Sequence, residues 1–171
     1  MARDPGYSSN PAYSSILNPK FSVTIPPNVT SIGEGAFNQC ALLSVTFPDG
    51  GASLSIGNKA FLNSEYIASL TIARATSIGD YAFSGMNGLK SVTIGDSVTS
   101  IGDNAFSSCG ALQSVTIPDS VTSIGDAAFD SCYVLTTAVL GSGIVSLGSA
   151  PFNGCNNLET ITINSNLGDF A

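Results

Sequence analysis

The sequence predicts a repeat solenoid, in which short coils of similar sequence stack along one axis, and three observations support this prediction. A phenylalanine recurs at nearly equal intervals from Phe37 to Phe152. The segments 91–109 and 114–132 are nearly identical, and the last three of the four cysteines are evenly spaced. The common interval is about 23 residues, and a fixed period of this length is typical of repeats that bury their apolar sides only against each other.

Each repeat begins with a segment that has the pattern of a half-buried strand. In LQSVTI (112–117), apolar residues occupy the first, fourth and sixth positions, and the last two alternate with Ser and Thr. This alternation places successive side chains on opposite faces of a strand. We therefore expect about seven short strands. The segments with this pattern are 20–25, 42–47, 67–72, 89–94, 112–117, 135–140 and 158–163.

Turn residues follow most of these segments. Pro, Gly and Asp occur in PDG (48–50), GDS (95–97) and PDS (118–120), and such residues end strands. The SIGD and AF blocks come next in each repeat. Their Gly permits a turn, and their Asp can cap a single helical or 3₁₀ turn. Stacking of the coils would then align the Val, Ile, Leu and Phe positions into one continuous core.

The ends of the array follow from the same spacing. Tyr13 lies one such interval before Phe37 and marks a degenerate first repeat, so we expect a tail over 1–11 and a solenoid over 12–171. LGDFA (167–171) resembles the start of a further turn. We therefore expect a piece of a longer array that lacks its C-terminal cap. An uncapped end exposes its last coil, which allows self-association there.

The composition excludes several classes of protein. Hydrophobic residues make up 43% of the 171 residues and charged residues 10%, whereas disordered chains are polar and highly charged. The net charge of -7 argues against nucleic acid as a partner. No apolar run approaches the roughly 18 residues of a membrane helix, so we expect no membrane insertion. The segment 1–15 lacks the apolar core of a signal peptide, so either the chain is intracellular or a leader was removed.

No candidate catalytic group emerges from the sequence. The chain has no histidine, which excludes Ser-His and Cys-His nucleophile pairs. Its serines and carboxylates fall in repeated columns, whereas paired acid and base carboxylates need distinct environments. We therefore expect no enzymatic activity and no cofactor.

Two repeated columns suggest metal or disulfide chemistry, but simpler roles fit them better. Asp80, Asp103 and Asp126 share one column, and Ca²⁺ takes 6–8 oxygen ligands. Asn58 and Ser149 interrupt this column, which favours local backbone capping over a metal site. The cysteine column lacks a C-x-x-C pair for zinc, and we expect buried free thiols. A bridge between adjacent coils is the alternative. The column contains Cys109, Cys132 and Cys155.

The outward strand positions form two columns of small hydroxyl residues. The first is Ser22, Ser44, Ser69, Ser91, Ser114, Thr137 and Thr160, and the second is Thr24, Thr46, Thr71, Thr93, Thr116, Val139 and Thr162. Such a lattice could match ice or a crystalline polysaccharide, or it could reflect only the preference of Thr for strands. We predict ligand contacts at its centre, from Ser69, Thr71, Ser91, Thr93, Ser114 and Thr116.

Residues that break the repeat are the candidates for selectivity, because identical coils cannot distinguish partners. Aromatic residues and Arg are the usual energetic anchors of binding surfaces. We assign ligand binding to Tyr66, Arg74 and Lys90. Tyr66 and Arg74 lie in the least regular unit, 57–79. The full set of candidates is Lys20, Glu65, Tyr66, Arg74, Lys90 and Tyr133.

The L-x-x-V-x-I strand followed by I-G-x-x-A-F-x-x-C resembles the BspA-type leucine-rich repeats of bacterial and protist surface proteins. The resemblance covers about residues 12–171. Ser64 and Met86 replace the cysteine, and Ser149 and Pro151 replace the acidic and small residues of the pattern.

This resemblance implies both a fold and a role. The fold is a right-handed horseshoe with a parallel β-sheet of about seven short strands on its concave side. Short turns, β-bridges or 3₁₀ turns lie on its convex side. The role is noncatalytic binding or adhesion at the cell surface or after secretion, with an extracellular protein or glycoprotein as partner. A structural spacer and an ice or lattice binder are the alternatives.

Overall fold

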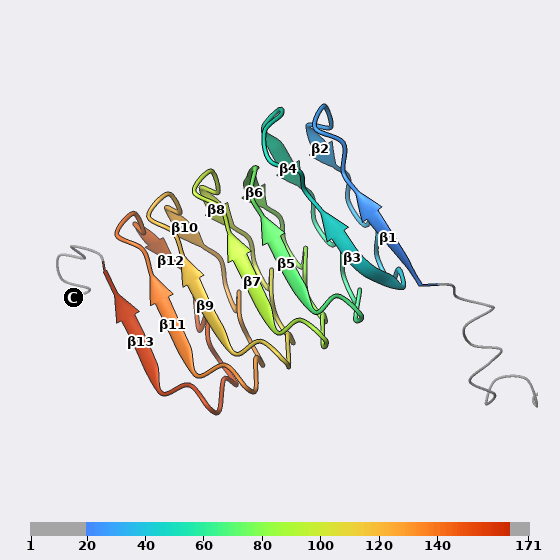
Figure 1. Cartoon of the computed structure of the whole chain (residues 1–171). Coiled ribbons are helices and arrows are strands. Elements are labelled where there is room, and N and C mark those ends of the chain that lie inside the picture. Colours follow the sequence, from blue (N-terminus) through green and yellow to red (C-terminus); the bar gives the residue numbers. More distant parts are fainter. Residues whose placement is uncertain (1–19, 165–171) are drawn as a thin grey trace, which may run out of the picture.

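The structure, a computed structural model, describes residues 20–164. These residues form thirteen short β-strands and no helix. Every strand pair is parallel, and the chain winds through about six turns of a β-solenoid. Figure 1 shows the coils stacked side by side from β1 to β13. The predicted fold class, a repeat solenoid of the leucine-rich-repeat type, is confirmed.

The longer strands lie on one side of the solenoid, which we call the long-strand face. They are β1 (Phe21–Thr24), β3 (Leu42–Thr46), β5 (Ser69–Ile72), β7 (Ser91–Ile94), β9 (Ser114–Ile117), β11 (Thr137–Leu140) and β13 (Thr160–Ile163). The seven strands fall within the seven predicted segments. Side chains alternate between surface and core, as in β9, where Val115 and Ile117 are buried and the residues before them are exposed.

The long-strand face is not one uninterrupted sheet, contrary to the expectation. Its strands form three hydrogen-bonded groups, β1-β3, β5-β7 and β9-β11-β13. The first break coincides with unequal turns, since the connection from Phe47 to Ser55 is longer than the equivalent one from Ile72 to Ser77. The second break, between β7 and β9, coincides with a proline that is described below.

The other strands, of two to four residues, form a second side that is continuous, and we call it the short-strand sheet. They are β2 (Ser31–Ile32), β4 (Leu54–Ile56), β6 (Ala75–Ile78), β8 (Ser100–Ile101), β10 (Ser123–Ile124) and β12 (Ser146–Leu147). These six strands make one parallel sheet, which confirms the predicted β-bridges. A glycine follows each of them, and from the second coil on the preceding coil lies too close for a Cβ. A Cβ at Gly125 would lie 2.6 Å from the Asp103 backbone nitrogen.

The AF turns form the third side and stack their rings into a column. Successive rings are nearly parallel, with centroids 5.1 to 5.4 Å apart. This offset arrangement is favourable for aromatic pairs. The turns also bond through their backbones, since Phe83 N–H donates to Ala105 O at 2.8 Å. The column contains Phe37, Phe61, Phe83, Phe106, Phe129 and Phe152.

The cysteine column completes the core with free, buried thiols, as predicted. The Cys109 Sγ donates to Phe83 O in the preceding coil at 3.3 Å, and Cys132 does the same to Phe106 O. The Ser64 hydroxyl occupies this column and donates to Phe37 O at 3.1 Å. The thiol therefore satisfies a carbonyl that would otherwise be buried without a partner. Burial raises the pKa of Cys109 to about 12.

Some predictions concern the ends of the chain. Tyr13, the tail over 1–11 and the LGDFA segment at 167–171 lie outside the described residues. The boundary of the solenoid and the missing cap therefore stay predictions. Among residues 20–164, no helix is long and apolar enough to cross a membrane.

Candidate functional site

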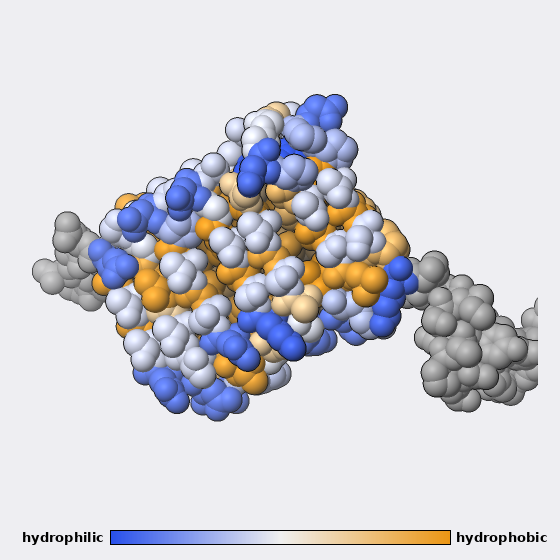
Figure 2. All heavy atoms as spheres, in the orientation of Figure 1, coloured by the Kyte–Doolittle hydropathy of each residue, from blue (hydrophilic) through white to orange (hydrophobic). Residues whose placement is uncertain are grey.

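The predicted hydroxyl columns lie on the long-strand face and point outward. The side chains of the six hydroxyl residues assigned to ligand binding are all exposed, while Leu70 and Ile72 between them are buried. Pairing of β5 with β7 places Ser69 opposite Ser91 and Thr71 opposite Thr93. Figure 2 shows this face as pale, weakly polar rows with apolar atoms between them and strongly hydrophilic residues at the rims.

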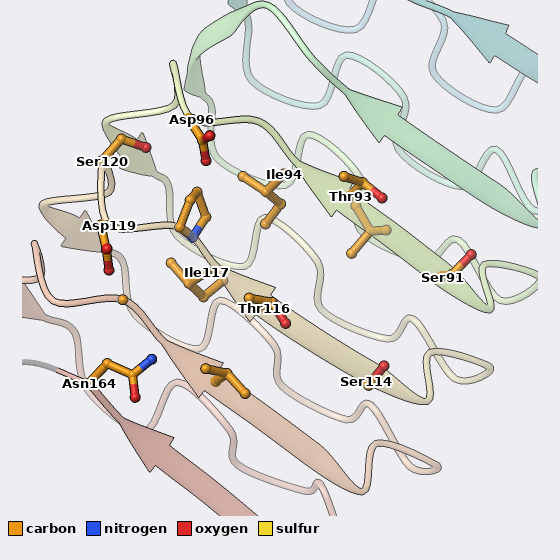
Figure 3. A pocket seen from close by; sticks show the side chains of 14 residues that line it. Ser91, Thr93, Ile94, Asp96, Ser114, Thr116, Ile117, Asp119, Ser120 and Asn164 are labelled. Carbon is orange, nitrogen blue, oxygen red and sulfur yellow. The ribbon is translucent and has the colours of Figure 1, made fainter.

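A hollow of about 720 Å³ opens on this face where β7 and β9 are not paired. We call it the β7–β9 hollow, and Figure 3 shows it from close by. Hydroxyl residues line it at the start and middle of the strands, and the partly exposed Val92, Pro118 and Val139 add apolar surface. The hydroxyl residues are Ser91, Thr93, Ser114 and Thr116, four of the six that the sequence predicts.

Pro118 lies beside the break between β7 and β9. At the equivalent position of the preceding coil, Gly95 N–H donates to Ile72 O at 3.0 Å. Proline has no N–H, so Pro118 cannot donate in this way to Ile94 O. Pro48 lacks the same donor, yet β1 and β3 are paired, so the absent N–H accompanies the break and does not by itself cause it.

The charged groups of the hollow are both negative. Asp96 and Asp119 lie where the strands give way to turns, at the opposite end from Ser91 and Ser114 (Figure 3). Ser142 N–H donates to the Asp119 Oδ1 at 2.7 Å, and this bond lowers the pKa of Asp119. The Ser120 hydroxyl also lines the hollow, and its oxygen is buried without a hydrogen-bond partner.

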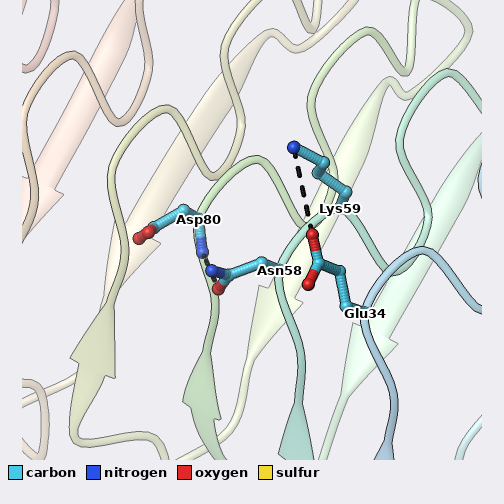
Figure 4. Close-up of polar contacts among 4 residues, drawn as sticks. All are labelled: Glu34, Asn58, Lys59 and Asp80. Atoms are coloured by element: carbon cyan, nitrogen blue, oxygen red, sulfur yellow. Dashed lines mark hydrogen bonds and ion pairs between the residues drawn. The ribbon is translucent and has the colours of Figure 1, made fainter.

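No cation of the described chain pairs with either aspartate. Between residues 20 and 164, one ion pair is present, from Lys59 Nζ to Glu34 Oε1 at 4.0 Å (Figure 4). Both of its side chains are largely exposed, so it contributes little to stability. Lys90 precedes Ser91 and is exposed, but it does not line the hollow.

The repeat-breaking residues do not gather at one place. Tyr66 and Tyr133 are about half exposed, and the Lys20 Nζ lies 3.9 Å from the centre of the Tyr66 ring. Lys90 and Glu65 are also exposed. None of these five residues lines the β7–β9 hollow.

Arg74 has a structural role in place of the predicted ligand contact. Its side chain is 7% exposed, and its guanidinium donates to backbone carbonyls of the two preceding coils. The acceptors are Val29 O at 2.9 Å, Ala52 O at 2.8 Å, Pro26 O at 2.8 Å and Ile25 O at 3.4 Å. These bonds join three coils across the first break in the face. The binding surface proposed below therefore excludes Arg74.

The aspartate column forms its bonds between coils, which differs from the expected capping within one turn. Asp103 N–H donates to Asp80 Oδ1 at 3.0 Å, and Asp126 N–H donates to Asp103 Oδ1 at 2.8 Å. Asn58 continues the pattern, since its Oδ1 accepts from Asp80 N–H at 2.9 Å (Figure 4). Each carboxylate thus positions the next coil. No group of three or more metal-ligating residues gathers in the part of the chain that the structure describes.

The sequence reasoning did not assign Asp96, Asp119, Ser120 and Asn164 to the site, although all four line the hollow. The residue that follows the last apolar position of each strand segment gives no clear signal. It is proline in three coils, at Pro26, Pro48 and Pro118, and β1 and β3 are paired despite Pro48.

Comparison with protein families identifies one match. The family described as BspA type leucine rich repeat region matches residues 12–75 and 54–171, with six copies of the repeat. A comparison with curated proteins finds no significant match. No enzyme family is indicated by these comparisons.

Solved structures of bacterial leucine-rich repeat proteins resemble the chain. A leucine-rich repeat protein of T. pallidum is 25% identical, with a TM-score of 0.59 over 82% of this chain and 57% of that one. One from Bacteroides ovatus is 23% identical, with a TM-score of 0.56 over 82% of this chain and 48% of that one. A leucine rich cell surface protein of Faecalibacterium prausnitzii is 19% identical, with a TM-score of 0.52 over 85% and 60%. The chain thus spans about half to three fifths of their lengths.

Proposed function

Because the chain belongs to the family of BspA-type leucine-rich repeat proteins, we propose that it is a noncatalytic binding module of a cell-surface or secreted protein. It recognises a protein or glycoprotein of a host or a neighbouring cell through the long-strand face. The description of the F. prausnitzii relative as a cell surface protein supports this location.

The β7–β9 hollow is the observation that carries the proposal. Identical coils present the same groups at every step and cannot fix a partner at one position. The hollow differs from the rest of the face because it combines four hydroxyls, an apolar floor and two carboxylates in one place. Pockets of mixed lining with a few polar groups that fix orientation are typical of binding sites.

A binding measurement on a blocked hollow tests the proposal. Thr93→Tyr together with Thr116→Tyr places two rings over the hollow, and tyrosine is well tolerated in strands. We expect saturable binding of the chain to a panel of immobilised extracellular-matrix proteins and glycoproteins, with at least a tenfold loss of affinity in this variant. Biolayer interferometry measures the binding of the parent chain and the loss of affinity in the variant.

The control for this experiment is Thr30→Tyr, which adds the same ring at an exposed loop position before β2, away from the long-strand face. Thr30→Tyr should bind as the parent chain does. Equal loss in both variants, or unchanged binding after Thr93→Tyr and Thr116→Tyr, would contradict a role for the hollow.

A structural spacer is the second candidate, and the continuity of the other two sides favours it. The short-strand sheet and the phenylalanine column run without a break from the first described coil to the last. Six steps between the seven longer strands span about 29 Å at the usual strand spacing. If the chain is a spacer, deletion of one whole coil should change the activity of the full protein in step with the lost length. The variant Thr93→Tyr plus Thr116→Tyr should then have no effect.

The lattice binder is less well supported by the fold. The long-strand face breaks twice, and Val139 interrupts the threonine column, so the hydroxyls do not form one regular array. Thermal hysteresis of the chain, abolished by Thr93→Tyr, would favour this alternative.

A further inference from the structure

The β7–β9 hollow carries charge that the described chain leaves uncompensated. Asp96 and Asp119 occupy the same position in consecutive coils and line one end of the hollow. Both side chains are exposed. The one ion pair within residues 20–164 involves other residues. A cation placed between the two carboxylates would neutralise their charge.

One of the two carboxylates is fixed by a hydrogen bond. Asp119 receives the Ser142 N–H at 2.7 Å, which fixes its orientation and lowers its pKa, so it is ionised at neutral pH. The backbone of Ser120 follows it along the hollow, but the Ser120 hydroxyl oxygen is buried, so the acceptors open to a ligand here are the two carboxylates. The charged end of the hollow is therefore a set of acceptors.

The remaining lining is apolar and hydroxylic. Ile94 and Ile117 lie between the carboxylates and the strand hydroxyls (Figure 3) but are buried, so the partly exposed Pro118 supplies the apolar surface here. Lysine and arginine side chains suit this lining, because each has an aliphatic stem that packs on apolar surface and a cationic head that carboxylates attract. The hydroxyls of Thr93 and Thr116 can bond the backbone of the same segment.

We propose that the β7–β9 hollow binds a lysine or arginine side chain of a partner protein, with the cationic head between Asp96 and Asp119 and the stem over Pro118. This assignment rests on the proposed binding function and names the chemistry of its partner. An anionic glycan does not fit, because both charged groups of the hollow are negative.

Titration with a defined peptide tests the assignment. The probe is a peptide labelled at its N-terminus, tetramethylrhodamine-Gly-Arg-Gly-Lys-Gly-Arg-Gly-amide, added to the whole chain and followed by fluorescence anisotropy. We expect saturable binding that weakens at least tenfold in Asp96→Asn plus Asp119→Asn, and less in each single variant. Asparagine keeps an oxygen for the Ser142 N–H, so the fold should persist, and circular dichroism verifies this.

A matched variant separates site binding from general charge attraction. Asp49→Asn together with Asp80→Asn removes the same two charges from exposed or partly exposed positions outside the hollow. This variant should keep the parent affinity. Equal weakening in both double variants would overturn the assignment, and so would absence of saturable binding to the parent chain.

A second probe distinguishes a basic peptide segment from a cationic glycan as the ligand of the hollow. An oligomer of glucosamine carries ammonium groups without a long aliphatic stem. Tighter binding of this oligomer than of the peptide would overturn the assignment to a basic protein segment. If the natural partner is lost with Thr93→Tyr plus Thr116→Tyr but retained with both Asp→Asn changes, the binding function stands and the basic-side-chain assignment fails.

Discussion

Single residues in this chain act mainly by satisfying the backbone of a neighbouring coil. The Cys109 thiol, the Ser64 hydroxyl and the Asp103 carboxylate all bond a backbone group of another coil. Buried backbone groups without partners are costly, so each of these side chains supports the stacking itself. The repeated positions in the sequence therefore supply hydrogen-bond partners for the backbone of neighbouring coils, in addition to side chains that pack together.

The first prediction concerns the Cys109 thiol and alkaline pH. Its folded pKa of about 12 lies above the ordinary value of 9.0, so the folded state keeps a proton that the unfolded state loses. The free energy of unfolding should therefore fall as pH rises from 9 toward 12, by up to about 1.4 kcal/mol per pH unit for this group. Urea denaturation at several pH values measures this slope.

Cys109→Ser is the matched variant. Ser64 shows that a hydroxyl in this column makes the same bond to a phenylalanine carbonyl, here at 3.1 Å. The variant should fold and lose part of the alkaline dependence, because serine does not titrate in this range. An identical slope in both proteins would exclude Cys109 as a source of the dependence.

The sequence predicts which residues are exposed or buried wherever a column repeats. The outward hydroxyls and the buried thiols are examples, and strand alternation is sufficient to place the hydroxyls. Arg74 shows where this reasoning fails. A lone cation in an irregular unit is most simply placed at the surface, and only the three-dimensional path of two preceding coils shows four carbonyls converging on it.

At the scale of elements, the sequence pattern predicts where the strands lie but not which strands pair. The seven predicted segments each contain one strand of the long-strand face. The first break in pairing coincides with an unequal turn length and the second with Pro118, and strand periodicity reports neither. The β7–β9 hollow lies at the second break, so the hydroxyl columns predicted four of its eight polar lining residues and missed the other four.

Arg74 joins the first coils, and its removal should loosen them. Arg74→Ala would leave several buried carbonyls without donors. We expect the free energy of unfolding to fall by about 3–5 kcal/mol, the range seen when one member of a buried charged network is removed. Hydrogen exchange should be accelerated mostly over residues 20–78.

Lys90→Ala serves as the control for Arg74, because it removes an exposed cation of the same charge. Surface changes of this kind usually alter stability by no more than about 0.5 kcal/mol. A similar small effect for Arg74→Ala would mean that the guanidinium does not hold the coils together.

The missing N–H at Pro118 leads to a prediction about the hollow. Pro118→Gly restores a donor at the position where Gly95 bonds Ile72 O. We expect β7 and β9 to pair more fully, with a protected amide at position 118 in hydrogen exchange. Binding of partners at the hollow should weaken, because its opening narrows.

Gly141→Ala is a useful comparison for Pro118→Gly, since a Cβ there would lie 2.6 Å from Pro118 backbone atoms and disturb the preceding coil without adding a donor. An unprotected amide at 118 in the glycine variant would show that the proline does not cause the break.

The whole molecule is held together by contacts between neighbouring coils. Phe106 is fully buried and lies 5.3 Å from both Phe83 and Phe129, measured between ring centres. Phe106→Ala should lower the free energy of unfolding by about 3–5 kcal/mol. Because solenoid stability is a sum of neighbour terms, the urea transition should also broaden or split at this coil.

Phe152→Ala tests the dependence on position. This ring is partly buried, and within the described residues it stacks on Phe129 alone at 5.4 Å. Its loss should cost less than that of Phe106, and the transition should stay single. Equal effects at both positions would contradict a stability carried by successive neighbours.

The β7–β9 hollow arises between two coils of almost the same sequence, and this has a consequence for gene evolution. Unequal recombination within 91–132 would insert a whole copy of a coil, together with its proline, aspartate and hydroxyls. The product would display two recognition pockets one step apart. Since linked sites raise avidity without any new contact, lengthening the gene by one unit would by itself strengthen attachment to a partner that carries repeated motifs.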